Sequence, residues 1–308
     1  MAAKIITPEL LSALMTSFRA DFQKGLTGAP SQYSKIATVI PSNSRSNTYG
    51  WLGKFPKFRK WVGDRVISQM AAHGYQIENE KLESTVGVDR ADIEDDTLGI
   101  YAPLFEELGL AAGEVYDSLT FSALSQGFNL PCYDGQNFFD TDHPVYPNVD
   151  GTGTATSVAN TYHNAAYTGD PWYVLDCSRA IKPIIYQERT KPELDVVKDP
   201  TNAHVFIKDE YLYGGRIRGA AGYGFWQMAY AMRDTLNSDN LWKVIKAMRA
   251  VTGDGDKKLG IRPTVLVVPP SLEDVATKLL EREFTSENGV TVDNELQGRL
   301  ELVVGDYL

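Results

Sequence analysis

The chain has 308 residues, of which 43% are hydrophobic and 23% are charged, and its formal net charge is -10 at pH 7. This composition is typical of a soluble globular protein with one large domain or two ordinary ones. The acidity argues against tight, sequence-independent binding to DNA or to anionic membranes, since both need cationic surfaces. Only Cys132 and Cys177 are present, which favours a reducing cytoplasm over a secreted disulfide scaffold.

The first 50 residues predict a helix followed by an extended segment. Apolar residues recur at helical spacing over 7–24, where Thr7 suits the N-cap and Pro8 the first helical position. Residues 29–50 are rich in Ser, Thr and Asn and predict extended backbone. Together these features indicate an N-terminal arm over 1–50.

Residues 51–96 predict a long two-stranded excursion. Its first part, "WLGKFPKFRKW", mixes basic and aromatic residues, its last part, "VGVDRADIEDD", is acidic, and apolar positions between them partly alternate. An isolated hairpin is only marginally stable in water, so a long one is expected to lie against another surface. We define the basic strip of this segment as Trp51, Lys54, Phe55, Lys57, Phe58, Arg59, Lys60, Trp61 and Arg65.

Three interpretations of the basic strip follow from its residue types. Its cations and rings would offer phosphate contacts and base stacking to a single-stranded nucleic acid. Its Trp and Arg side chains would equally suit a buried contact in a protein assembly. The hairpin would otherwise fold back on its own domain. The residues by themselves leave these three alternatives open.

Residues 97–126 predict the clearest helix of the chain, with apolar side chains along one face. At about 1.5 Å per residue, this helix would span on the order of 40 Å. Gly109 and Gly113 lie inside it, and each costs about 1 kcal/mol relative to Ala. We therefore expect tertiary packing to hold the helix.

The remaining residues predict a mixture of strands and helices. A stretch rich in Gly, Thr, Ser and Asn over 146–171 has the composition of an exposed loop. Amphipathic spacing predicts a helix over 238–252, and Ser271 with Asp274 approximates a capping box for another. Strands are expected in "WYVLD", "KPIIYQER", "HVFIKDEYLYGGRIRGAAGYGFWQMAYAM", "PTVLVV" and "LELVV". The predicted class is α+β.

The segment "FFDTDHP" carries Asp140, Asp142 and His143, which are possible metal ligands. The other histidines show no ligand spacing, and Asp-x-Asp-His-Pro is also favourable turn chemistry. The sequence has no phosphate-binding glycine loop and no nucleophile elbow. We expect no catalytic residue, no cofactor and no metal, and we keep a metal-dependent hydrolase using these three residues as the alternative function.

Several long segments resemble one known family. They are "ADFQKGLTGAPSQYSKIATVIPSNSRSNTYGWLGKFPKFRKWVGDR", "TVGVDRADIEDDTLGIYAPLFEELG", "CYDGQNFFDTDHP" and "GIRPTVLVVPPSLEDVATKLL". Together they resemble the major head subunits of bacteriophage Mu and Mu-like prophages, and the likeness covers nearly the whole chain. The first segment is long and highly specific.

The resemblance implies the tailed-phage capsid fold of the Hong Kong 97 type. Its parts would be an N-terminal arm (1–50), an extended loop (51–96), a peripheral domain (97–235) with a spine helix (97–126), and an axial-type domain (236–308). It implies a structural subunit, not an enzyme, that self-assembles into hexamers and pentamers. These would form an icosahedral head around double-stranded DNA that is enclosed without specific binding.

The resemblance also implies partners and a location. Scaffold, portal and decoration proteins would be further partners, no membrane would be involved, and the subunit would be made in the host bacterial cytoplasm and end in the virion. The basic strip would then contact an acidic surface of the adjacent subunit. Its rings would supply most of the attachment, because an exposed ion pair contributes only about 0–1 kcal/mol.

Overall fold

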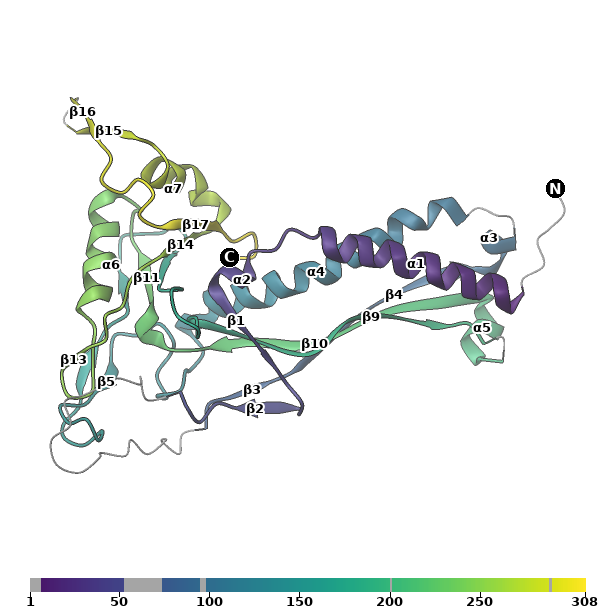
Figure 1. Ribbon diagram of the computed structural model, residues 1–308, viewed down its shortest axis with the longest axis horizontal. Helices are drawn as coiled ribbons and strands as arrows, with labels where there is room; N and C mark the ends of the chain where they lie inside the picture. The colour runs from purple at the N-terminus through teal and green to yellow at the C-terminus, as the bar shows by residue number, and fades with distance from the viewer. Residues whose placement is uncertain (1–6, 53–73, 95–97, 200, 288–289) are drawn as a thin grey trace.

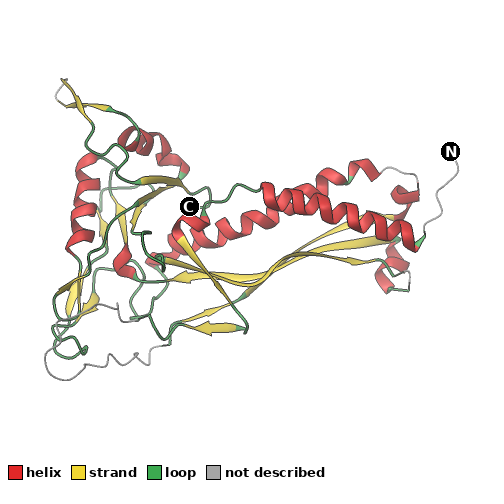
Figure 2. Ribbon diagram, in the orientation of Figure 1, coloured by secondary structure: helices red, strands yellow, loops and turns green. Residues whose placement is uncertain are grey.

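The molecule has a broad end and a long, narrow arm (Figures 1 and 2). A computed structural model describes residues 7–52, 74–94, 98–199, 201–287 and 290–308. Long helices and long strands run side by side along the arm, whereas the broad end combines a second sheet with the C-terminal helices (Figure 2). The α+β class predicted from the sequence is confirmed.

The arm consists of helices packed on a four-stranded sheet with strand order β1-β9-β10-β4. Strand β1 pairs in parallel with β9, while β10 is antiparallel to both β9 and β4. Helices α1 and α4 lie along one face of this sheet, and the short helices α3 and α5 lie at its far end (Figure 1). The bounds are α1 Pro8–Gly28, α3 Arg90–Glu94, α4 Ala102–Ser125, α5 Ala203–Lys208, β1 Ala37–Pro41, β4 Glu80–Asp89, β9 Ile184–Val197 and β10 Glu210–Tyr223.

Helices α1 and α4 approach each other closely through glycines. A Cβ added at Gly109 would lie 2.0 Å from the carbonyl oxygen of Phe22, and one added at Gly25 would lie 1.8 Å from the carbonyl oxygen of Glu106. Only a residue without a side chain fits such contacts. Helix α1 therefore starts at the predicted Thr7 cap but continues beyond residue 24 to Gly28, because Gly25 is a packing residue and not a terminator.

The broad end is built on a five-stranded sheet with order β17-β14-β8-β11-β7. Its strands β8 and β14 are buried at every position, as expected of strands covered on both faces. Helices α6 and α7 also belong to this end (Figure 1). The bounds are β7 Thr161–His163, β8 Trp172–Leu175, β11 Ala229–Arg233, α6 Ser238–Ala250, β14 Val265–Val268, α7 Glu273–Leu280 and β17 Glu301–Val304.

The remaining elements are short. Helix α2 (Tyr33–Ile36) precedes β1, and its start is fixed by Asp117 of α4, whose carboxylate accepts hydrogen bonds from the backbone N–H groups of Gln32 and Tyr33. The small strands and 3-10 helices are β2 Ser46–Thr48, β3 Gln76–Glu78, η1 Leu98–Ile100, η2 Gln126–Phe128, β5 His143–Val145, β6 Thr156–Val158, η3 Trp226–Met228, β12 Thr252–Gly253, β13 Lys257–Lys258, η4 Pro270–Leu272, β15 Phe284–Glu287 and β16 Val290–Asp293.

Two of the regions expected from the sequence contain strands that pair across the expected boundaries. Residues 80–89, which fall within the excursion expected over 51–96, form β4 and pair with β10 of the arm sheet, whereas residues 53–73 of that segment lie outside the described residues. Strands also pair across the boundary expected at residue 235, because β8 and β11 share the broad-end sheet with β14 and β17, which come later in the chain. Each of the two sheets is therefore built from strands that are not consecutive in the chain.

Two local predictions were wrong. The segment "HVFIK" forms helix α5 instead of a strand, because Asn202 caps its first turn and Asp209 ends it in the left-handed region at φ 54°. Ser271 does not cap α7. Its hydroxyl donates instead to Asp170 at 2.6 Å, and the residue at the N-cap is Leu272.

Candidate assembly surfaces and a buried polar cluster

Trp51 is the one residue of the basic strip within the described part of the chain. Its side chain is 37% exposed, and its ring centroid lies 5.9 Å from that of Tyr49 and 6.1 Å from that of Phe225. The start of the strip is thus partly packed on the rest of the molecule. The other residues of the strip, Lys54, Phe55, Lys57, Phe58, Arg59, Lys60, Trp61 and Arg65, lie outside the described residues.

A buried hydrogen-bond network holds the two chain segments that flank residues 53–73. The hydroxyl of Tyr49 donates to the side-chain oxygen of Gln187 at 2.7 Å, and the Gln187 amide donates to the side-chain oxygen of Asn79 at 2.8 Å. Asn79 in turn donates to the Ser42 hydroxyl at 2.9 Å. Since Gln187 lies in β9 and is fully buried, both segments are tied to the arm sheet. Strands β2 and β3 pair just beyond this network.

The far end of the arm exposes two large apolar side chains. Phe206 and Ile207 of α5 are 82% and 73% exposed, whereas the neighbouring Val205 is 4% exposed and belongs to the arm core. Val205 therefore attaches the helix while Phe206 and Ile207 face outward. This pair is not evident from the sequence, because the apolar run "HVFIK" also suits a strand. The Asn202 cap followed by an apolar run was the signal that could have revealed a helix.

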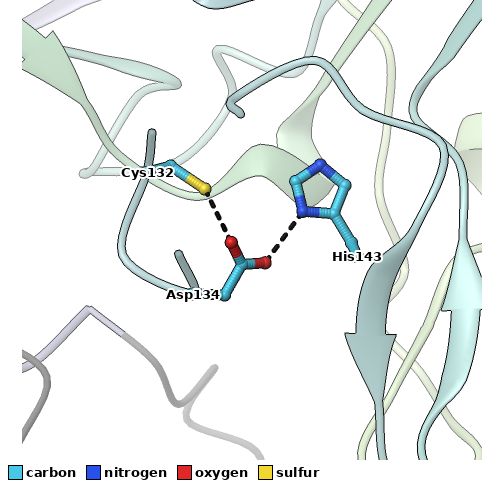
Figure 3. A group of neighbouring side chains, drawn as sticks. All are labelled: Cys132, Asp134 and His143. Atoms are coloured by element: carbon cyan, nitrogen blue, oxygen red, sulfur yellow. Dashed lines mark hydrogen bonds and ion pairs between the residues drawn. The ribbon is translucent and has the colours of Figure 1, made fainter. Parts of the chain in front are cut away.

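The structure brings His143 together with Cys132 and Asp134, from a turn that precedes β5 (Figure 3). The Nδ1 atom of His143 lies 2.8 Å from Oδ2 of Asp134, and the Cys132 thiol donates to Oδ1 of Asp134 at 3.1 Å. His143 is fully buried and its ring stacks on Trp226 with centroids 4.0 Å apart.

Asp140 and Asp142, the two other residues of the sequence-predicted metal set, do not join this group. The carboxylate of Asp140 accepts a hydrogen bond from the backbone N–H of Thr141 at 2.7 Å, as in a turn, and Asp142 is exposed. The three residues of the alternative metal-dependent hydrolase, Asp140, Asp142 and His143, therefore do not form one cluster. The proximity of Cys132 and Asp134 to His143 is not evident from the sequence, because only the fold of the turn brings them together.

The environment of this cluster perturbs two acidic groups. Burial acts to raise the pKa of Asp134, but the hydrogen bond and charge of His143 outweigh it, so that this pKa is lowered and the carboxylate is held ionised. Burial, followed by the nearby charge of Asp134, raises the pKa of the Cys132 thiol well above its usual range. The cysteine is thus a thiol in this arrangement and not a reactive thiolate.

Comparison with known proteins identifies the family. The model of the family "Mu-like prophage major head subunit gpT" matches residues 11–308. The chain is 57% identical over 304 residues to the major capsid protein of Escherichia phage Mu, covering 99% of this chain and 100% of that protein. It is 54% identical over 305 residues to the Mu-like prophage FluMu major head subunit of Haemophilus influenzae, covering 98% and 99%. The chain belongs to the Mu-like major head subunit family.

Solved structures agree with this assignment. A chain of the procapsid of bacteriophage JBD30 superposes with a TM-score of 0.86 at 53% identity, covering 98% of this chain and 100% of that one. A chain of the JBD30 capsid gives a TM-score of 0.78 at 38% identity, covering 99% of each. The tailed-phage capsid fold of the Hong Kong 97 type is therefore confirmed, and this head subunit is a structural protein of a Mu-like phage capsid. Among the described residues, no helix of the subunit is long and apolar enough to span a membrane.

Proposed function

We propose that this major head subunit self-assembles into hexamers and pentamers that close into an icosahedral head around double-stranded DNA, without catalysing a reaction. The observation that supports this most directly is the full-length likeness to chains of the JBD30 procapsid and capsid. The net charge of -10 suits a shell that encloses DNA without gripping it. Synthesis in the host cytoplasm precedes assembly.

Within this proposal, the chain divides into the parts of its fold type. Residues 1–50 act as the N-terminal arm and residues 51–79 as the extended loop. The helix-covered arm sheet forms the peripheral domain with α4 as its spine helix, and the sheet containing β14 and β17 forms the axial-type domain. The hydrogen bonds of Gln187 at both flanks of residues 53–73 support a loop with a fixed base.

Helix α5 at the far end of the arm serves as a contact with a second copy of the subunit. Two side chains as exposed as Phe206 and Ile207 would bury a large apolar area on association, at about 25 cal/mol per Å². A capsid subunit meets many copies of itself, so a copy is the occupant that this surface meets at high local concentration. Even a contact of low free energy per subunit can stabilise the whole shell, because the shell repeats it many times.

Replacing both Phe206 and Ile207 with Asp should leave the subunit folded but abolish formation of closed particles. Their side chains make few contacts within the subunit, and two buried carboxylates would oppose association. Negative-stain images and sedimentation of the variant, with circular dichroism as a folding check, measure the effect. The matched control is Phe206→Leu with Ile207→Val, which keeps the surface apolar and should assemble. Normal particles from the Asp variant would show that α5 is not an assembly contact.

The basic strip contacts an acidic surface of the adjacent subunit. Changing Lys54, Lys57, Arg59 and Lys60 to Glu should therefore prevent assembly, because like charges would face each other across the contact. Single-strand DNA binding, measured by fluorescence anisotropy, provides the second readout. Loss of DNA binding with assembly intact would assign the strip to nucleic acid instead. Unchanged assembly and unchanged DNA binding would leave it the role of a hairpin packed on its own domain.

Additional partners complete the proposed head. Minor capsid protein trimers decorate one JBD30 capsid whose chain superposes on this subunit with a TM-score of 0.76. This supports a decoration protein on the outer surface of the present head as well. Scaffold and portal proteins are the other partners that we propose for assembly.

A further inference from the structure

The ring of His143 faces an oxygen acceptor at each of its two nitrogens. Nε2 lies 3.2 Å from Oδ1 of Asn160, and this amide has a fixed orientation. Its nitrogen donates to the carbonyl oxygens of Phe138 and Trp226, and its oxygen accepts from the backbone N–H of Asp140 at 2.9 Å. Nε2 must therefore carry a hydrogen, and the same nitrogen cannot also serve as an acceptor.

Among the residues that the structure describes, no neutral group donates a hydrogen bond to the second nitrogen. Nδ1 faces Oδ2 of Asp134, a carboxylate whose other oxygen already accepts from the backbone N–H of Gln136 and from the Cys132 thiol. Two acceptors thus face each other unless a cation lies between them. That cation is either a proton on Nδ1 or a metal ion bound by Nδ1, Asp134 and Cys132.

We propose that Cys132, Asp134 and His143 bind a divalent ion of the zinc class. Sulfur, imidazole nitrogen and carboxylate oxygen are the ligand types that Zn²⁺ takes in proteins, and the three ligand atoms here lie within 4.8 Å of one another. The hydrogen bond from Nε2 to Asn160 is the outer-shell contact that orients a metal-binding histidine. Stacking on Trp226 fixes the plane of the ring.

The net charge of the cluster is the same before and after the ion replaces the protons. Without the ion, one proton lies between Nδ1 and the Asp134 carboxylate, Nε2 keeps its hydrogen and the thiol keeps its own, so the net charge of the cluster is zero. On binding, Nδ1 and the thiol each release a proton to solvent, and a dication then faces one carboxylate and one thiolate. The net charge is again zero, which matters because an uncompensated charge at a buried site is costly.

The three ligand atoms, which lie within 4.8 Å of one another, must shift to accept the ion. Ligand atoms bound to one tetrahedral zinc are roughly 3.3–3.8 Å apart, as follows from bond lengths of about 2.0–2.3 Å. The distance of 2.8 Å between Nδ1 and Oδ2 must therefore lengthen by about half an ångström, which rotation of the Asp134 carboxylate allows. Cys132 and Asp134 also line an open pocket of ≈ 800 Å³, which gives the ion a route from solvent and leaves room for a water as fourth ligand.

The ion would join the turn that carries Cys132 and Asp134 to strand β5. In this turn Gly135 adopts φ +87° and Pro131 forms a single bridge with Asn137. The same pocket is lined by Gly74, Tyr75 and Gln76, which follow residues 53–73 in the chain. Metal binding would therefore stiffen the broad end next to the base of the proposed extended loop.

Elemental analysis of purified full-length protein tests the proposal. Wild-type protein, incubated with Zn²⁺ and freed of excess by gel filtration, should retain about one zinc per subunit by plasma mass spectrometry, because the described part of the chain holds one such ligand set. Cys132→Ser should lose this zinc, whereas Cys177→Ser, the matched change at the other cysteine, should keep it. Wild-type protein that retains no zinc would overturn the proposal and assign the cation to a proton. Equal zinc in wild type and Cys132→Ser would overturn it as well.

A spectroscopic measurement covers the case in which Cys132→Ser does not fold. The Cys177→Ser variant loaded with Co²⁺ should show a thiolate-to-cobalt charge-transfer band, which can then come only from Cys132. Competition by a chelator should remove the band, and lowering the pH should weaken binding because the ligands must lose protons. Absence of the band in Cys177→Ser protein that is demonstrably folded would contradict the assignment of Cys132 as a ligand.

Discussion

The arm and the broad end of the subunit are stabilised in different ways. The broad end holds the larger core, in which strands β8 and β14 are buried at all positions and aromatic rings gather around Tyr173 and Phe138. The arm has a separate, smaller core between helices α1 and α4 and one face of its sheet. Its centre is the contact of Phe18, Phe105 and Tyr213, with ring centroids 4.1–5.1 Å apart.

This difference indicates how a long projection can remain ordered in a single subunit. A thin layer buries little apolar area per residue, so it depends on close approach of its few elements. The glycine contacts between α1 and α4 provide that approach. The broad end, by contrast, is covered on both faces of its sheet. The loss of one contact there leaves many other buried side chains in place. We therefore expect the arm to open separately from the broad end.

The largest expected effect comes from matched truncations in the two cores. Phe105→Ala in the arm and Phe138→Ala in the broad end each remove a fully buried ring and should each cost roughly 3–5 kcal/mol. Hydrogen exchange of the unassembled subunit, measured by mass spectrometry, should then separate them. Phe105→Ala should increase exchange in α1, α4 and β4 only, whereas Phe138→Ala should increase it throughout the molecule.

The same hydrogen-exchange measurement can contradict a separate opening of the arm. If Phe105→Ala raises exchange equally in β8 and β14, the two cores unfold as one cooperative unit and the arm has no independent opening. Urea unfolding followed by fluorescence provides a second check, since independent opening of the arm should give a first transition before the main one.

Much of the fold could be predicted from local pattern and from the family resemblance. Helices α1, α4 and α6 and strands β8, β14 and β17 all lie where periodicity or apolar runs placed them. The errors occur where tertiary contacts decide the outcome. Residues 80–89 alternate like any strand, and nothing in their own sequence indicates that β10 is their partner. Gly25 resembles a helix terminator until its contact with Glu106 is known.

The candidate sites were less accessible to sequence analysis. The sequence offers His143 as a possible ligand only together with its neighbours Asp140 and Asp142. Cys132 and Asp134 reach it through a turn closed by Gly135, a route that spacing does not reveal. Phe206 is likewise exposed because its neighbour Val205 is the residue of α5 that faces the arm core. Which side of a short helix is buried is decided by packing.

A smaller effect is expected from the glycine contact that keeps the arm thin. Gly109→Ala places a Cβ 2.0 Å from the carbonyl oxygen of Phe22, so the helices must move apart. Overpacking typically lowers the free energy of unfolding by about 1–3 kcal/mol. The higher helix propensity of Ala relative to Gly offsets up to about 1 kcal/mol of this loss. The free energy of unfolding of the unassembled subunit, measured with urea, should therefore fall by about 1–2 kcal/mol.

The matched control is Gly28→Ala, at the end of α1. A Cβ at Gly28 has no described atom within 4 Å, so only the propensity term applies and the subunit should be unchanged or slightly more stable. If Gly109→Ala were as stable as this control, the helices would have room to separate at no cost, and close approach would not be what stabilises the arm. If both variants were equally destabilised, the cause would lie in the glycine backbone and not in the contact between α1 and α4.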